Sequence, residues 1–203
     1  MLTLENLMSL DKEEIPEAAK IMNRSEIPSL VKLLAEKNDK IRYHAFLLLQ
    51  YRSMFFNDVY PFWEDFCSKL SDSNSYQRSI GIMLIAENVR WDTDNKIEPI
   101  LDECKKLLKD EKPITVRQSI QSFGKIADAK PYLHERISHM LMAIDLLEIQ
   151  ETMRKSILLD IIHVLISIRK INKNEQIDCF LFHSLTGGIL DKKSIKQIEM
   201  LLA

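Results

Sequence analysis

The chain of 203 residues is long enough to bury a substantial hydrophobic core within one domain. Hydrophobic residues make up 46% of it and charged residues 29%, which excludes wholesale disorder, and a net charge of −2 provides no overall field that would attract nucleic acid or anionic lipid. Only 4 glycines and 6 prolines are present, which disfavours an all-β protein with many tight turns, so we expect an all-α fold.

The cysteines and the apolar segments indicate the compartment. Cys67, Cys104 and Cys179 are odd in number and far apart in the chain, so we expect neither a disulfide framework nor a zinc site. The first residues lack the basic segment of a secretory signal. No apolar stretch approaches the roughly 20 residues that a bilayer span requires. We therefore expect a cytoplasmic protein without a metal, a cofactor or a membrane anchor.

Residues 1–26 are expected to form an N-terminal cap. Leu4 to Leu10 can form one helical turn, and a short helix follows through Met22, with Pro16 near its first turn. The terminal units of a helical stack are usually atypical, because one of their sides must face water.

Residues 27–170 contain four repeats, each predicted to form two helices. A proline opens each first helix, where its missing N–H group costs nothing; these prolines are Pro28, Pro61, Pro99 and Pro131. Apolar residues then recur at spacings of three and four, as in Ile100, Leu101, Cys104, Leu107 and Leu108. This period is typical of amphipathic helices.

An arginine marks the start of each second helix. Arg42, Arg78, Arg117 and Arg154 lie 36, 39 and 37 residues apart, close to the roughly 40-residue period of repeated helix pairs. An acidic residue stands before each arginine, where its carboxylate can cap or complement the next helix N-terminus; these residues are Asp39, Asp72, Asp110 and Glu151.

Residues 171–203 are expected to form a degenerate fifth repeat. A first helix starts at residues 177–182, Gly187 and Gly188 interrupt the pattern, and a last helix covers residues 194–202. This repeat would close the array as a C-terminal cap.

These segments resemble HEAT repeats, whose motif has a proline in the first helix, an aspartate in the turn and a Val-Arg start to the second helix. The third repeat matches best, with Pro99, Asp110, Val116 and Arg117, and the resemblance covers about residues 27–165. It implies a right-handed α-solenoid of about five helix pairs in a single domain. Because HEAT-like architecture serves many unrelated functions, it implies a scaffold and nothing narrower.

The four arginines allow two interpretations. As a basic ladder they could bind phosphates or an acidic peptide. We favour a structural Asp/Arg ladder, in which turn carboxylates and helix-start arginines of successive repeats pair, because an acidic residue accompanies every arginine. This ladder would consist of Asp39, Arg42, Asp72, Arg78, Asp110, Arg117, Glu151 and Arg154.

The second helices are expected to carry the binding surface, because they line the concave face of HEAT-like stacks. Counting outward positions from each helix start predicts a groove for a partner helix or peptide, formed by Tyr43, Leu47, Met83, Gln118, Ser122, Lys155 and Leu159. The first three would form its apolar end. A helical phase wrong by one residue would instead place these side chains in the core.

No catalytic or metal-binding motif stands out in the sequence. His134 and His139 are five residues apart, which places them about 500° apart around a helix and therefore on different faces. With 4 glycines, neither a phosphate-binding loop nor a dinucleotide fingerprint can be assembled, and there is no nucleophile elbow. We expect a protein that is not an enzyme.

One enzymatic alternative deserves a structural test. Trp91-Asp92-Thr93-Asp94 is vaguely similar to the aromatic and aspartate surroundings of the damaged nucleotide in alkylpurine DNA glycosylases, which use a HEAT-like stack. Such an enzyme needs a strongly basic concave face, and this chain is slightly acidic. The structural interpretation is that Trp63 packs inside the second repeat and that Asp94 or Asn95 caps the next helix.

The sequence therefore predicts a non-catalytic scaffold that binds another protein. A nucleic acid is the alternative partner, and no small-molecule substrate is expected. A helper role in cofactor assembly or protein modification, which some HEAT-like proteins have, is a third possibility.

Overall fold

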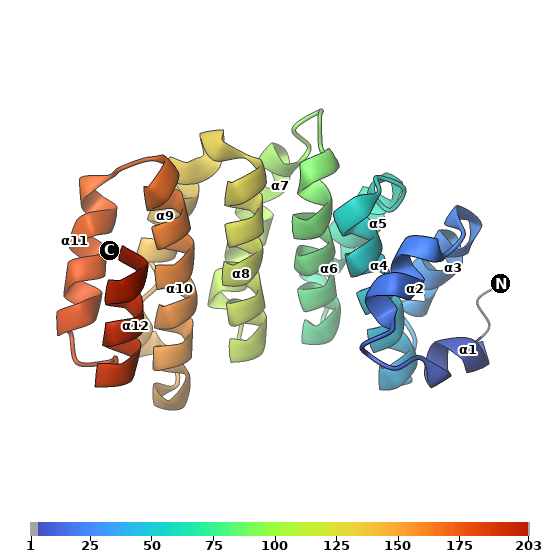
Figure 1. The fold of residues 1–203 in the computed structure, drawn as a ribbon, viewed down its shortest axis with the longest axis horizontal. Helices are drawn as coiled ribbons and strands as arrows, with labels where there is room; N and C mark the ends of the chain where they lie inside the picture. Colours follow the sequence, from blue (N-terminus) through green and yellow to red (C-terminus); the bar gives the residue numbers. More distant parts are fainter. Residues whose placement is uncertain (1–3, 203) are drawn as a thin grey trace. The chain divides into compact units, whose positions relative to one another are not determined.

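The computed structural model describes residues 4–202, with the side chains of residues 7–202. All regular secondary structure in this range is helical, as the sequence predicted. Figure 1 shows the α-helices, which are α1 (Leu4–Ser9), α2 (Ile15–Ile21), α3 (Ile27–Leu33), α4 (Asp39–Phe55), α5 (Trp63–Cys67), α6 (Ser75–Asn88), α7 (Ile97–Lys106), α8 (Pro113–Ala129), α9 (His134–Met142), α10 (Glu151–Ile171), α11 (Glu175–Thr186) and α12 (Lys192–Leu202).

Short 3-10 helices extend or precede several of these elements. They are η1 (Arg24–Glu26), η2 (Tyr60–Phe62), η3 (Ser68–Ser71), η4 (Val89–Trp91), η5 (Leu107–Lys109), η6 (Pro131–Leu133) and η7 (Leu146–Glu148). None of the helices described is both long and apolar enough to cross a bilayer. By its contacts the chain divides into two compact units, unit 1 up to Glu103 and unit 2 from Cys104.

The helices follow one another in the pairs that the repeat predicted: α3/α4, α5/α6, α7/α8, α9/α10 and α11/α12. The prolines lie in the first turns of α3, η2 and η6 and at the third residue of α7. Each repeated arginine is the fourth or fifth residue of its second helix. The repeat pattern therefore located both helices of four pairs, and the fifth pair, α11/α12, lies in the C-terminal segment expected to form a degenerate repeat.

Asparagines cap two of the second helices, while Asp39 and Glu151 lie in the first turns of α4 and α10, where a carboxylate complements the helix N-terminus. Asn38 caps α4 by accepting from the backbone N–H groups of Lys40 and Ile41, and Asn74 caps α6 by accepting from Tyr76. An asparagine side chain offers the same kind of acceptor oxygen as a carboxylate, so it can take the cap position directly before the helix. Asp39 consequently lies inside the first turn of α4.

Unit 1 is built around α4 and α6, which pack against each other. α2 and α3 pack on α4, and α5 and η3 pack on α6. The fully buried side chains between these helices include Leu30, Leu48, Leu49, Trp63 and Phe66. The burial of Trp63 agrees with the structural interpretation of this tryptophan.

A buried ion pair joins three segments of unit 1. Arg52 of α4 donates to both carboxylate oxygens of Asp58, with the Nη2–Oδ2 distance at 2.6 Å. Its Nη1 donates to the backbone carbonyls of Ala19 and Lys20 at the end of α2. The ring of Phe56 stacks on the guanidinium, whose carbon lies 3.8 Å from the ring centroid. Arg52 therefore ties α2 and the segment before η2 to the end of α4.

Gly81 allows α6 to approach α5 closely. A β-carbon at this position would lie 2.8 Å from the backbone carbonyl oxygen of Phe66, which is a steric overlap. A residue without a β-carbon is therefore needed where the two helices cross.

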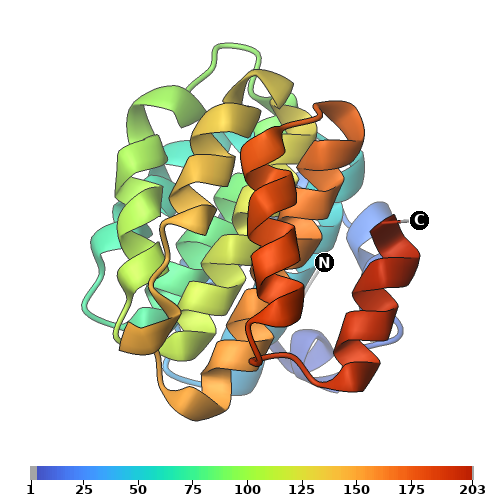
Figure 2. The same cartoon turned by 90° about the vertical axis from the view of Figure 1, so that its left-hand side faces the viewer.

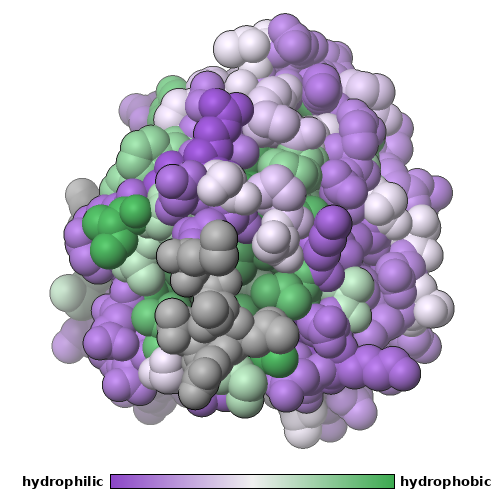
Figure 3. Space-filling model, turned by 90° about the vertical axis from the view of Figure 1, so that its right-hand side faces the viewer, coloured by the Kyte–Doolittle hydropathy of each residue, from purple (hydrophilic) through white to green (hydrophobic). Residues whose placement is uncertain are grey.

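The surface of unit 1 carries several exposed apolar side chains. Figure 3 shows hydrophobic atoms among hydrophilic ones on the N-terminal side of the molecule. The exposed large apolar residues near the ends of α2 and α4 are Ile21, Met54, Phe55 and Phe56. Lys20 lies over the ring of Phe55, with its nitrogen 5.0 Å from the ring centroid.

In unit 2, α8 and α10 pack against each other. α9 packs against both of them, η5 packs against α8, and α11 packs against α10. The fully buried side chains here include Ile120, Phe123, Ile137, Ile161 and Leu165. Figure 2 looks at the C-terminal end of this unit, where α11 and α12 lie, and Ile198 anchors α12 by its buried side chain.

Candidate functional site: a polar groove between α8 and α10

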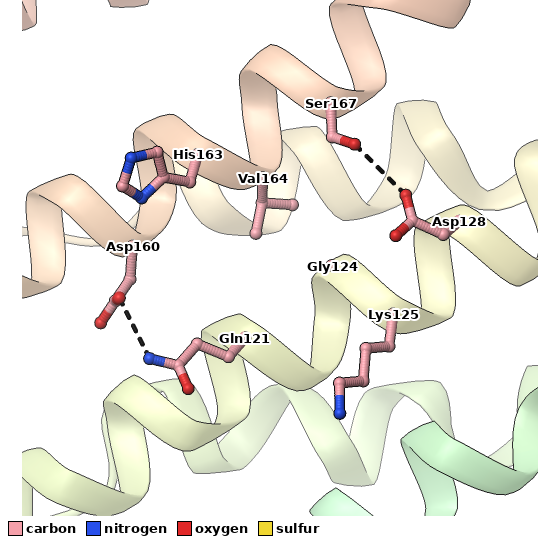
Figure 4. Close-up of a pocket in the computed structure, with 8 residues that line it drawn as sticks. All are labelled: Gln121, Gly124, Lys125, Asp128, Asp160, His163, Val164 and Ser167. Atoms are coloured by element: carbon pink, nitrogen blue, oxygen red, sulfur yellow. Dashed lines mark hydrogen bonds between the residues drawn. The ribbon is translucent and has the colours of Figure 1, made fainter. Parts of the chain in front are cut away.

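A groove of about 370 Å³ runs between α8 and α10 in unit 2 (Figure 4). Both elements are second helices of their pairs, so the groove lies on the helices that were expected to carry the binding surface. Residues that line it are Gln121, Gly124, Lys125 and Asp128 of α8 and Asp160, His163, Val164 and Ser167 of α10.

Gly124 and Val164 form the apolar floor of the groove. A β-carbon on Gly124 would lie 3.0 Å from a methyl carbon of Val164, so the side chain of Val164 packs directly on the backbone of α8 here. Polar lining residues stand beside this contact and about one turn before and after it on both helices. Gly124 and Val164 are in contact at the centre of the groove, and longer polar side chains surround them. The result is a groove with a narrow apolar floor.

Asp160 organises one end of the groove. Its carboxylate accepts from Nε of Arg117 at 2.6 Å and from Nη2 at 3.2 Å, and from the side-chain amide of Gln121 at 3.1 Å (Figure 4 shows the Gln121 bond). Asp160 is buried, and its hydrogen bond is the main cause that raises the pKa of Arg117. A carboxylate held by a bidentate arginine and an amide is fixed in position, and it in turn holds the side chain of Gln121 in the groove.

The other end of the groove combines Ser167 and Asp128, whose Oγ–Oδ1 distance is 3.3 Å (Figure 4). His163 and Lys125 are exposed, on α10 and α8 respectively. The serine therefore donates its proton to a carboxylate of the other helix. The groove offers hydrogen-bond donors and acceptors, and it contains positively and negatively charged side chains. Such a site is suited to holding a polar segment of another chain.

In α8 the outward positions differ from the predicted ones by one residue. Ser122 is only 2% exposed and faces the core, so its predicted place on the binding surface is wrong. Gln118 is half-buried, and its side-chain carbonyl oxygen is buried without a hydrogen-bond partner. Gln121 and Lys125 occupy the groove instead. A shift of one residue turns a helix position by about 100°, which exchanges the open and buried sides.

The two predicted residues of α10 are not among those that line the groove. Lys155 binds the carboxylate of Asp191, directly before α12. Leu159 is half-buried. The groove positions of α10 are those of Asp160, His163 and Ser167, again displaced from the predicted ones.

The three apolar residues predicted at the end of the surface belong to unit 1. Tyr43 is 44% exposed on α4, and the ammonium nitrogen of Lys12 lies 5.2 Å from its ring centroid. Leu47 of α4 and Met83 of α6 are half-buried. These side chains are accessible on two helices that pack together, while His44 and Ser79 beside them are buried.

The repeated arginines bind mostly to the turns in front of their own helices. Arg42 pairs with Asp39 at 2.5 Å and donates to the carbonyl of Glu36. Arg78 donates to the backbone carbonyls of Asp72 and Ser73. Arg154 donates to the carbonyls of Ile149 and Leu147.

Arg117 forms an ion pair with the next second helix through Asp160, and the guanidinium of Arg42 lies 5.2 Å from the ring centroid of Tyr76 in α6. Asp110 instead accepts from the backbone N–H of Lys112, and Glu151 is exposed at the start of α10. The sequence analysis missed Asp160. A signal was available, because Asp160 is the one acidic residue between Ile157 and Ile168, where most residues are apolar, and a buried carboxylate requires a partner.

The segment that is vaguely similar to DNA glycosylases, Trp91 to Asp94, is tied to the surrounding fold by hydrogen bonds of Trp91 and Asp92. Asp92 is 2% exposed, and its oxygens accept from the backbone N–H groups of Lys96 and Ile97 at 2.9 and 3.0 Å and from the Tyr60 hydroxyl at 2.9 Å. Asp92 therefore binds the backbone N–H groups at the start of α7. Burial is the main cause that raises the pKa of Tyr60, and its bond to Asp92 adds to the shift. Trp91 donates to the carbonyl of Ser53.

The cysteines differ strongly in their surroundings, and none of the three forms a disulfide. Burial raises the pKa of the Cys67 thiol to about 12, and the carboxylate of Glu64 contributes. Cys104 is buried and Cys179 is exposed. Within the described residues there is no group of three or more His, Cys, Asp or Glu side chains that could hold a metal ion.

These differences predict the order in which the thiols react. Because the thiolate is the reactive form, a raised pKa keeps Cys67 protonated at about pH 8 and slows its alkylation. We expect iodoacetamide to modify Cys179 first in the native protein and all three cysteines in urea, as read by peptide mass spectrometry. Equal rates for Cys67 and Cys179 in the native protein would contradict this prediction.

The comparisons with known proteins concern the fold. No family model and no curated protein matches the chain. Among solved structures the chain is similar to a designed armadillo repeat protein, with a TM-score of 0.54 and 17% identity, over 98% of this chain and 96% of that one. An engineered protein gives a TM-score of 0.46 at 17% identity, with 98% of each chain covered. The first likeness confirms an all-α solenoid of helix pairs.

Proposed function

We propose that this HEAT/armadillo-like helical repeat protein is a non-catalytic interaction scaffold, and that the polar groove between α8 and α10 holds a segment of a partner protein. The observation that carries the proposal is the groove itself, an open site of about 370 Å³ on the second helices. Its polar side chains come from two helices, and those of Asp160 and Gln121 at one end are held by hydrogen bonds. The partner is a peptide or helix, as such surfaces accept.

Two further observations support a binding role over a catalytic one. Ser167 donates to Asp128, so this serine is not paired with the imidazole of His163 on its own helix. Asp92, the aspartate of the glycosylase-like segment, is buried as a helix cap with several donors on its oxygens. The thiols without disulfides fit a reducing compartment such as the cytoplasm.

The test compares two triple variants of the tagged protein in affinity purification from its native cell with nuclease treatment. The groove variant is Gln121→Ala, Lys125→Ala, His163→Ala. A matched control replaces one glutamine, one lysine and one histidine that are exposed and lie outside the groove. These substitutions are Gln176→Ala, Lys173→Ala and His139→Ala. Both variants should retain the circular dichroism spectrum of the wild type, because the altered side chains are exposed.

A stoichiometric protein that the wild type and the control retain and the groove variant loses would support the scaffold and its site. Retention of that protein by the groove variant would refute the groove. Recovery of nucleic acid alone, removed by nuclease, would instead favour the nucleic-acid-binding alternative.

A further inference from the structure

An exposed pair of glycines connects the last helix of unit 2 to the helix before it. Gly187 and Gly188 link α11 to α12, and Gly188 has a φ of 81°, a left-handed conformation that glycine adopts without strain. A β-carbon added to Gly188 would have no atom within 4 Å. Because this link is not packed against the protein, the contacts of α12 itself must hold the helix in place.

α12 buries few of its side chains. Those that it buries belong to Ser194 and Ile198, whereas α10 buries nine. Met200 and Leu201 near the end of α12 are 72% and 43% exposed. Buried apolar area provides most of the free energy that holds one helix against another, so α12 is held less firmly than α10.

An exposed ion pair joins the start of α12 to α10. The ammonium group of Lys155 donates to the carboxylate of Asp191, which also accepts from the backbone N–H of Ser194 at 2.8 Å. These bonds, that of Lys155 first, lower the pKa of Asp191. Figures 1 and 2 both show α12 beside α10. Since exposed ion pairs contribute little to stability, this pair orients α12 but does not fix it firmly.

α12 thus contacts a side of α10 that was predicted to bind a partner. Lys155 is one of the predicted residues, and Leu159 follows it by four positions, which places both on the same side of the helix. Leu159 is half-buried. Neither residue lines the groove between α8 and α10, so this side of α10 is a separate surface.

We propose that the side of α10 marked by Lys155 and Leu159 is a second interaction surface, which binds an amphipathic helix, and that α12 occupies it until a helix of a partner protein takes its place. α12 then moves away about the link formed by Gly187 and Gly188. This inference goes beyond the proposed function and does not depend on the groove.

The chemistry of the partner helix follows from that of α12. Ile195, Ile198 and Leu202 recur at spacings of three and four, so one side of α12 is apolar, and Ile198 at the centre of this side is buried. Asp191 places a carboxylate directly before the helix, opposite Lys155. The partner is therefore a helix of about three turns with an apolar stripe and an acidic residue at its N-terminus.

The experiment uses the isotope-labelled full chain and an unlabelled synthetic peptide with the sequence of residues 190–202. Ile198→Asp places a charge at the buried position of α12 and should release the helix. Met200→Asp makes a like change at an exposed position of α12 and is the control. The peptide is added up to about 2 mM, because α12 acts at an effective concentration in the mM range when it is attached to the chain. Amide NMR spectra show which signals shift.

We expect hydrogen exchange in α12 to be at least about tenfold faster in the Ile198→Asp chain than in the wild type or the control. The peptide should shift the amide signals around Lys155 and Leu159 in the Ile198→Asp chain and leave those of the other two proteins in place. Unchanged exchange in α12, no shifts in the Ile198→Asp chain, equal shifts in all three proteins, or shifts confined to other helices would each overturn the inference.

Discussion

Replacement of Arg52 with methionine is expected to lower the free energy of unfolding by about 3–5 kcal/mol, because it leaves Asp58 buried without its counter-ion. The side chains of Arg52 and Asp58 are 9% and 8% exposed, so water cannot readily replace the lost bonds. The carbonyls of Ala19 and Lys20 lose their donor in the same variant. Urea unfolding followed by circular dichroism would measure the change.

Two further variants separate the effect of burial from that of losing any ion pair. Arg169→Met removes the partner of Asp178 at an exposed pair, and should change stability by less than about 1 kcal/mol. Adding Asp58→Leu to Arg52→Met removes the stranded charge, so the double variant should be more stable than Arg52→Met alone. A loss below about 1 kcal/mol for Arg52→Met would show that the ion pair is dispensable.

The fold could be predicted from the sequence because its signals are periodic and local. The prolines mark the starts of the first helices, and the arginines, 36 to 39 residues apart, mark the starts of the second. A helix of three to five turns tolerates an error of one residue at either end without a change of fold. Repetition of the same pattern then fixed the order of the pairs before any contact was known.

The groove could be predicted only in part, because it depends on the rotation of each helix and on contacts between distant residues. The second helices were predicted to carry the surface, but the one-residue error in α8 selected Ser122 in place of Gln121. Arg117 and Asp160 are 43 residues apart, and no local pattern connects them. The hydrophobic period of a largely buried helix leaves its rotation poorly determined.

Arg52 illustrates the same limit in unit 1. In sequence it is one more arginine near a helix end, where a cation commonly interacts with the helix dipole. Its burial follows from the aromatic ring of Phe56 and from the carbonyls of α2, which lie more than 30 residues earlier. A buried ion pair of this kind can be identified only from the three-dimensional arrangement of the helices.

Replacement of Asp92 with alanine is the second large effect that we expect, a loss of about 2–3 kcal/mol in the free energy of unfolding, because α7 loses its cap and the Tyr60 hydroxyl loses its acceptor. Asp92→Asn keeps one acceptor oxygen and should lose less. The exposed Asp94 is the control, and Asp94→Ala should change stability by no more than about 0.5 kcal/mol.

The same experiment decides between the structural and the enzymatic interpretation of this segment. If Asp92 serves the fold, its hydrogen bonds stabilise the protein, and removing the carboxylate lowers the free energy of unfolding. Catalytic residues, in contrast, often reduce stability. A stable Asp92→Ala variant would therefore show that the cap is dispensable and would reopen the comparison with DNA glycosylases. A clear loss of stability would identify Asp92 as part of the framework that positions α7, and would leave the groove of unit 2 as the site to examine for function.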